Sequence, residues 1–279
     1  MPETLYPIPY IETVKAFMTV IRDNPPLPAL WYEPAPRHFD LSAPWWSKML
    51  LIAGLTILAL LFFDAPIAVF FREHARSIPD LARDASQGYR GGDVGRDLMF
   101  LEQWGQWVCS VVVILAVAVL DPKGRRRALA IAIGCLLTFL VTHLMKDLIG
   151  RSRPFVAPTS ADGHWIWGGP GKGFHGSSWG SFPSAHTTGA FALAAGLAWF
   201  YPRGRGLFMG LAVITAAQRV LHTAHYVSDV IAGIGIGVGV ARWTLGAKLA
   251  GRILALLPAE WQAWWAREQN ADKDFVQQN

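Results

Sequence analysis

The chain has little charge for its length. Asp, Glu, Lys and Arg make up 16% of its 279 residues, whereas apolar side chains make up 52%. A typical soluble domain carries about 25% charged residues. The apolar residues are also gathered into blocks of roughly helix length. Together, these two features favour one polytopic membrane domain over a soluble fold.

Cysteine is scarce as well. Only Cys109 and Cys135 occur, and both lie inside apolar blocks. Two thiols in such positions indicate neither a disulfide framework nor a zinc site. The net charge is +5, but the basic residues lie mainly between the apolar blocks, so we do not expect nucleic acid as a partner. The first forty or so residues also lack the pattern of a cleavable signal peptide.

Six apolar blocks predict an all-α membrane protein with about six transmembrane helices. The expected spans are residues 48–63, 103–120, 128–145, 184–201, 207–221 and 227–245. In the sixth, Gly235 and Gly239 are four residues apart, a spacing typical of a close helix contact.

The membrane domain is expected over residues 48–247, with a different kind of segment at each side. Residues 1–47 combine a predicted interfacial helix at 10–22, which has one apolar face, with a proline-rich linker. Residues 248–279 are expected to form a tryptophan-containing interfacial segment and a tail.

Basic residues orient the predicted bundle. Arg125, Arg126 and Arg127 crowd the connection after the second span, and Arg203 and Arg205 follow the fourth. The positive-inside rule assigns these loops to the cytoplasm, so stretches 146–183 and 219–229 share the outer face. We expect a bacterial inner membrane with a periplasmic site, although an internal eukaryotic membrane with a luminal site obeys the same rule.

The outer stretches carry residues suited to phosphoryl chemistry. His225 and Asp229 are four apart, so on a helix the carboxylate can accept the proton of one ring nitrogen and leave the other free to attack. Three cations suit the phosphoryl group under attack: Lys146, Arg153 and Arg219.

A helix start is predicted directly after Pro183. Ser184 and the next amides would then bind an oxyanion, and His186 in the first turn would donate a proton to the leaving oxygen. Taken alone, Ser184 is a common helix cap, and basic residues at a helix end are common interfacial anchors. The order, spacing and shared side of these residues favour catalysis over the structural interpretations.

Three sequence patterns resemble the signature motifs of the type 2 phosphatidic acid phosphatase superfamily. They are the run from Lys146 to Pro154, the run Pro183-Ser-Ala-His186, and Arg219 through His225 to Asp229. The resemblance covers residues 128–245. It implies a six-helix core and a metal-independent reaction without a cofactor. The soluble vanadium haloperoxidases share such motifs, but the six predicted membrane spans disfavour their activity for this chain.

The resemblance also implies a role for each site residue. His225 is the nucleophile that becomes phosphohistidine, Asp229 orients it, and His186 is the acid. The implied phosphate ligands are Lys146, Arg153, Ser184, Ala185 and Arg219. Two positions depart from the family pattern. Ala185 replaces the usual glycine, which a helical conformation tolerates, and Gln218 replaces a serine that supplies a supporting hydrogen bond.

Other residues near the motifs have open roles. His222 could join His225 and Asp229 in a zinc site, but a position at the rim is favoured and no metal is expected. Arg151 is expected to add charge to the phosphate site. The loop 155–182, rich in Gly and Trp, is compatible with a mobile cover over the site or with an interface anchor, and we hypothesise that it contributes to headgroup selection.

The expected activity is hydrolysis of a lipid phosphomonoester or pyrophosphate. Candidate substrates are phosphatidic acid, phosphatidylglycerophosphate, polyprenyl pyrophosphate and lipid A phosphates, which the motifs do not distinguish. The expected partners are this lipid phosphate and the membrane lipids, and the sequence does not indicate an oligomeric state. One alternative is a lipid phosphotransferase with the same site. An anion transporter is the other, but it leaves His186 and His225 unexplained.

Overall fold

The computed structural model describes residues 45–74, 83–84, 88–89, 100–121, 124–156, 166–174, 178–256 and 258. Within these ranges the regular secondary structure is helical apart from an isolated bridge and one antiparallel pair of short strands, β1 (Arg83–Asp84) and β2 (Gly88–Tyr89). The predicted all-α class is confirmed. The interfacial helix expected at 10–22 and most of the segment expected at 248–279 lie outside the described residues.

Each of the six expected spans corresponds to a helix. These helices are α2 (Trp45–Phe62), α5 (Trp107–Leu120), α6 (Gly124–Ile149), α7 (Ala185–Phe200), α8 (Arg205–Leu221) and α9 (Val227–Gly246). Two shorter helices follow α2 and α9 in the described residues: α3 (Asp64–His74) and α10 (Leu249–Ala255). Three described 3-10 turns lie in the connections: η3 (Gln103–Gly105), η5 (Lys172–Phe174) and η6 (Pro202–Gly204).

Not all six helices have the length of a membrane span. Among the described residues, α6 and α9 are long and apolar enough to cross a membrane, and α2 with α3 becomes a third candidate if this pair, bent by 56°, is one span. α5 is apolar but has only 14 residues. The existence of the helices is therefore confirmed, whereas the count of six spans stays a prediction.

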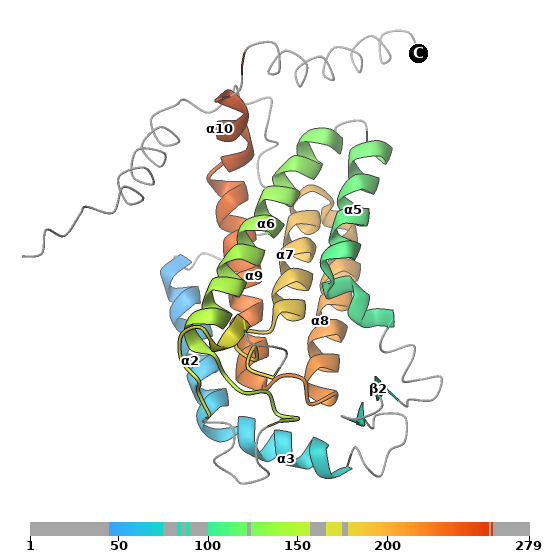
Figure 1. Cartoon of the computed structure of the whole chain (residues 1–279). Helices are drawn as coiled ribbons and strands as arrows, with labels where there is room; N and C mark the ends of the chain where they lie inside the picture. Colours follow the sequence, from blue (N-terminus) through green and yellow to red (C-terminus); the bar gives the residue numbers. More distant parts are fainter. Residues whose placement is uncertain are drawn as a thin grey trace, which may run out of the picture.

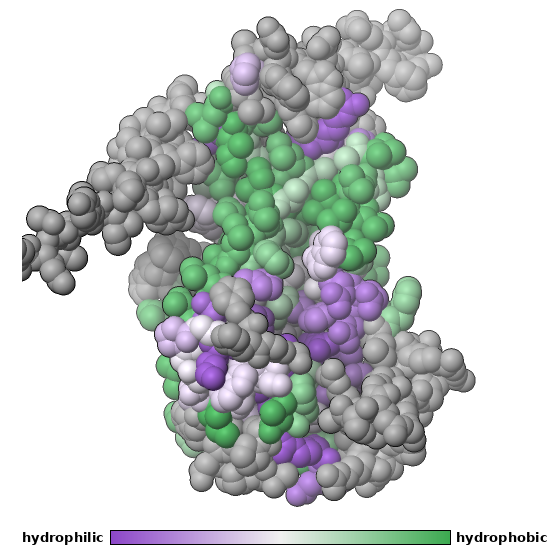
Figure 2. Space-filling view, viewed as in Figure 1, coloured by the Kyte–Doolittle hydropathy of each residue, from purple (hydrophilic) through white to green (hydrophobic). Residues whose placement is uncertain are grey.

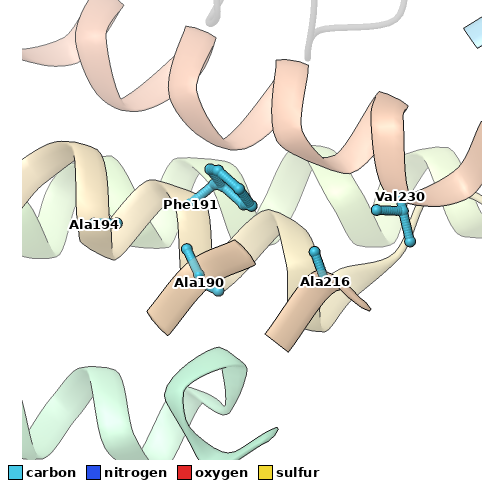
Figure 3. Packing of buried hydrophobic residues seen from close by; sticks show 6 residues of the cluster. Ala190, Phe191, Ala194, Ala216 and Val230 are labelled. Carbon is cyan, nitrogen blue, oxygen red and sulfur yellow. The ribbon is translucent and has the colours of Figure 1, made fainter. Parts of the chain in front are cut away.

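Helix α7 lies at the centre of the bundle and packs against α6, α8 and α9 (Figure 1). Its contact faces are built from small residues, so neighbouring helices approach closely. Figure 3 shows residues of one buried cluster: Ala190, Phe191 and Ala194 of α7, with Phe191 directed toward α9, together with Ala216 of α8 and Val230 of α9. This tight packing fixes the helix starts that carry the predicted site residues.

The contact expected at Gly235 and Gly239 is confirmed. A methyl group added at Gly235 would overlap the side chain of Ile52 on α2, and one added at Gly239 would touch Met49. These two glycines therefore allow α9 to pack directly against α2.

The loops gather at two opposite ends of the bundle. At one end, Arg127 Nη1 donates a hydrogen bond of 2.8 Å to Asp121, and the Tyr201 hydroxyl donates to the same carboxylate, which joins the α5–α6 and α7–α8 connections. At the other end, α3 and the loops after α6 and α8 meet (Figure 1). In Figure 2, apolar side chains cover the middle and upper part of the helices and hydrophilic ones gather toward the lower end. The predicted site residues lie toward that lower end.

Candidate active site

Backbone hydrogen bonds join the three motif regions. The Ser181 amide donates to the Arg151 carbonyl at 3.0 Å, and the Ser184 amide donates to the Asp229 carbonyl at 3.1 Å. After α8, the amides of Ala224 and His225 both donate to the Arg219 carbonyl at 3.1 Å. The predicted convergence of distant stretches at one end of the bundle is therefore present.

His225 is buried in the loop before α9. Its Nδ1 lies 2.8 Å from the Ser181 carbonyl oxygen, which can only accept, so Nδ1 carries the proton and Nε2 keeps its electron pair. Burial, together with the charge of Arg153, lowers the pKa of His225 well below its ordinary value. The imidazole is consequently neutral near pH 7, as a nucleophile has to be.

Asp229 supports His225 differently from the prediction. Its Oδ2 lies 3.6 Å from His225 Nδ1, beyond hydrogen-bond distance, and the Ser181 carbonyl occupies the expected position. Oδ2 instead accepts hydrogen bonds from the Ser181 hydroxyl at 2.5 Å and the Tyr226 amide at 2.9 Å. The carboxylate turns back to cap its own helix, and its hydrogen-bonded link to His225 runs through Ser181.

The predicted cations lie around this histidine. Lys146 is buried near the end of α6 and donates to the Gly180 carbonyl. The positive charges of Arg153 and Lys146 both act to lower the pKa of His225. Arg219 is buried near the end of α8. This arrangement can neutralise a phosphoryl group presented to His225.

The start of α7 matches the predicted anion-binding turn. Ser184 is its N-cap and is fully buried, and its hydroxyl accepts a hydrogen bond from Thr187 Oγ1 at 3.0 Å. Ala185 is the first helical residue, so its methyl group causes no backbone strain where the family usually has glycine. The Ser184 amide donates to the Asp229 carbonyl, so this helix start lies beside the first turn of α9.

His186 contacts a carboxylate that the sequence analysis missed. Its Nε2 lies 3.1 Å from Glu102 Oε1 and 2.8 Å from the side-chain amide of Gln106. Glu102 also pairs with Arg219 Nη1. The sequence signal was weak, because Glu102 is one acidic residue just before an apolar block and far from all three motifs.

Gln218 makes the supporting hydrogen bonds that its departure from the family pattern had put in doubt. Its Nε2 donates to Glu102 Oε2 at 2.8 Å and lies 3.2 Å from His222 Nδ1. The glutamine therefore links Glu102 to His222, which is buried behind the site as a packed residue. Among the residues that the structure describes, no three His, Cys, Asp or Glu side chains form a metal-binding group.

Arg151 lies behind the site and not in the phosphate pocket. It is fully buried, with Nη1 2.6 Å from Asp229 and Nη2 2.8 Å from Asp64, the first residue of α3. Asp64 also accepts a hydrogen bond of 2.9 Å from the Ser228 amide. The expectation that Arg151 adds charge to bound phosphate is not supported by this position. Its guanidinium instead neutralises two buried carboxylates, one of which is Asp229.

Part of the loop 155–182 covers this ion pair. Trp167 forms an isolated bridge with Arg151, and the guanidinium lies 4.9 Å from the centre of its ring. Lys172 lies 5.9 Å from the ring centre of Trp179. The middle of the loop, including Trp165, lies outside the described residues, so its role in headgroup selection stays a prediction.

An apolar cavity of about 690 Å³ leads to the site between α5, α6 and α7. Val111 and Ile114 of α5 line it on one side and Leu136 and Phe139 of α6 on another, and His186 of α7 is also among its lining residues. The cavity has the volume of a small-molecule pocket and the lining that a hydrocarbon chain requires.

Comparisons with known proteins give one family. Residues 127–250 match the family model of the PAP2 superfamily. A lipid A 1-phosphatase of Rhizobium johnstonii is 28% identical over 242 residues, which cover 78% of this chain and 86% of that protein. A lipid A 1-phosphatase of Rhizobium etli is 27% identical over 214 residues, covering 69% and 80%.

A solved structure shares the fold. It is the transmembrane PAP2 type phosphatidylglycerolphosphate phosphatase from Bacillus subtilis, with 19% identity and a TM-score of 0.50, and the match covers 72% of this chain and 94% of that one. The likeness supports a membrane-embedded helical fold for the chain.

Proposed function

We propose that this chain, whose residues 127–250 match the PAP2 superfamily model, dephosphorylates a membrane lipid by way of a phosphohistidine on His225. A lipid phosphatase activity agrees with both curated relatives, each of which matches most of this chain. The observation that carries the mechanism is the 2.8 Å contact of His225 Nδ1 with the Ser181 carbonyl, which leaves Nε2 available to attack.

In the first step, the electron pair of His225 Nε2 forms a bond to phosphorus while the bond from phosphorus to the lipid oxygen breaks. Lys146, Arg153 and Arg219 neutralise the phosphoryl oxygens, and the first-turn amides of α7 stabilise the charge that develops on them. His186 gives its proton to the leaving lipid oxygen, so a neutral alcohol departs.

In the second step, His186 takes a proton from a water molecule whose oxygen bonds to phosphorus. The P–N bond breaks, and inorganic phosphate and the free His225 imidazole are regenerated. A lipid hydroxyl in place of that water would make the enzyme a phosphotransferase. No metal ion takes part in either step of this proposal.

The substrate proposed here is the 1-phosphate of a lipid A type glycolipid, because both curated relatives are lipid A 1-phosphatases. The apolar cavity between α5 and α6 supports sideways entry of the lipid, with hydrocarbon against Leu136 and Phe139 and the phosphate near His186. The site is proposed to face the periplasm, since the basic connections at Arg125–Arg127 and Arg203–Arg205 lie at the other end of the bundle.

Phosphate release from defined lipids tests this function. Purified protein in detergent with EDTA is given lipid A, phosphatidic acid, phosphatidylglycerophosphate and a polyprenyl pyrophosphate. We expect fastest release from lipid A and loss of at least about 1,000-fold in His225→Ala, since the nucleophile is removed. His74→Ala, which alters an exposed histidine on α3, is the matched control and keeps full activity.

Two outcomes would count against the proposal. Equal activity of His225→Ala and the unaltered protein would remove His225 as nucleophile. Transfer of radiolabelled phosphate to an added lipid, without release of inorganic phosphate, would identify a phosphotransferase instead.

A further inference from the structure

Glu102 lies between two residues of the proposed site. Its carboxylate is 3.1 Å from His186 Nε2, pairs with Arg219 Nη1 and accepts a hydrogen bond of 2.8 Å from Gln218. Burial alone would raise the pKa of Glu102, but the hydrogen bond from His186 and the charge of Arg219 lower this pKa to about 2. Glu102 is therefore an anion over the whole range in which enzymes work.

The backbone holds this carboxylate in place. A methyl group added at Gly105 would lie 2.5 Å from the His186 carbonyl oxygen, so only glycine allows η3 to approach the first turn of α7 this closely. On the other side, Thr215 Oγ1 donates to the Leu101 carbonyl at 3.2 Å. The segment before α5 is thus fixed against both α7 and α8.

The contact determines which nitrogen of His186 is available for proton transfer. Nε2 faces Glu102 and the side-chain amide of Gln106. A flip of this amide would present its oxygen, which can accept a proton from Nε2. Among the described residues, we find no hydrogen bond to His186 Nδ1. A protonated ring would donate its Nε2 proton in a hydrogen bond to Glu102 and have its Nδ1 proton available for a substrate oxygen.

We propose that Glu102 is a positioning residue that stabilises the protonated form of His186, so that His186 can act as the acid for a poor leaving group. This inference rests on the proposed function. When the P–O bond breaks, the Nδ1 proton moves to the lipid oxygen, and His186 is left neutral, with its Nε2 proton still on the ring and donated as a hydrogen bond to Glu102. In the second step a water proton returns to Nδ1, so the proton balance closes.

The identity of the leaving group separates this role from a merely structural one. A lipid or sugar alkoxide needs a proton as it leaves, whereas a nitrophenolate leaves without one. An ion pair that only held Arg219 or the fold in place would matter equally for both. Loss of the acid, in contrast, affects only the alkoxide substrate.

The experiment compares kcat/KM of Glu102→Gln, which reports on the steps up to departure of the leaving group and not on the later water step that both substrates share. The two substrates are phosphomonoesters that carry the same alkyl chain, one an alkyl phosphate and one a nitrophenyl phosphate. Glutamine keeps the size of the side chain and an oxygen for Arg219, but removes the charge. We expect a loss of about a hundredfold on the alkyl phosphate and less than about threefold on the nitrophenyl phosphate. Activity on the nitrophenyl phosphate also shows that the variant is folded.

Controls make the two possible failures distinguishable. Glu73→Gln removes the same charge from an exposed position on α3 and leaves both rates unchanged. Equal losses on both substrates, or no loss on either, would overturn the role of Glu102 while leaving the proposed function intact. If the unaltered protein released no phosphate from any lipid, the proposed function itself would fail.

Discussion

At the residue scale, the protonation of His225 makes a prediction about pH. The imidazole attacks only when neutral, and burial together with Arg153 lowers the pKa of His225 well below its ordinary value of 6.5. A lowered pKa means that the neutral form persists as the pH falls. We therefore expect kcat/KM to hold to pH values clearly below 6.5 before the acidic limb begins.

The measurement is the pH profile of kcat/KM on a nitrophenyl phosphate, corrected for the second ionisation of the substrate. That ionisation is obtained separately from a phosphorus NMR titration. An enzyme-derived acidic limb at pH 6.5 or above would show that His225 is not desolvated as its position indicates.

The residues of the three motifs could be identified from sequence because chemistry and spacing agree within each short stretch. Asp64 and Glu102 could not. Each is one acidic residue at the edge of an apolar block, and only the packing of α3 and η3 brings it to Arg151 or His186. The proton acceptor of His225 was missed for a related reason, since it is a backbone carbonyl, at Ser181, and carries no sequence signal.

At the scale of elements, the contact between α2 and α9 gives a prediction of stability. A methyl group at Gly235 would overlap Ile52, so Gly235→Ala has to push the two helices apart. We expect a loss of about 1–3 kcal/mol, the usual cost of overpacking. Gly210→Ala is the matched control, because Gly210 is exposed in α8 and an added methyl group meets nothing within 4 Å.

Thermal unfolding of both variants in the same detergent provides the comparison. Gly210→Ala should be neutral or stabilised by up to about 1 kcal/mol, since alanine favours the helix. Equal melting temperatures for the two variants would mean that α2 does not pack against α9 in the folded protein.

Helix existence was easier to predict than helix ends. The apolar blocks marked all six helices, but α6 runs from Gly124 to Ile149, past both ends of the expected 128–145. The expected span stops short because Arg125 to Arg127 and Lys146 are charged and so indicate the ends of an apolar block. The helix itself continues through these residues. Helix α5, in contrast, begins at Trp107, later than the expected residue 103. The residues before it form the η3 turn, which brings Glu102 toward His186.

At the scale of the whole molecule, the two ends of the bundle differ in chemistry. One end joins Asp121, Arg127 and Tyr201 in the short connections. The other end, where α3 and the loops after α6 and α8 meet (Figure 1), holds Lys146, the Ser181 loop and His225. The sequence predicted this division from alternating spans and loop charges, and the structure agrees on which loops lie together. Which side of the membrane each end faces is predicted from the positive-inside rule alone.

Site-directed labelling tests that orientation. In a background with Cys109 and Cys135 replaced by Ala, single cysteines are introduced as Lys172→Cys in η5 at the site end and Arg203→Cys in η6 at the other, both exposed. A membrane-impermeant maleimide added to intact spheroplasts should label Lys172→Cys at once and Arg203→Cys only after permeabilisation. The reverse pattern would place the site in the cytoplasm. Each variant serves as the control for the other, and phosphate release verifies that both are folded. The cysteine that reacts first therefore identifies the side of the membrane on which the lipid phosphate is removed.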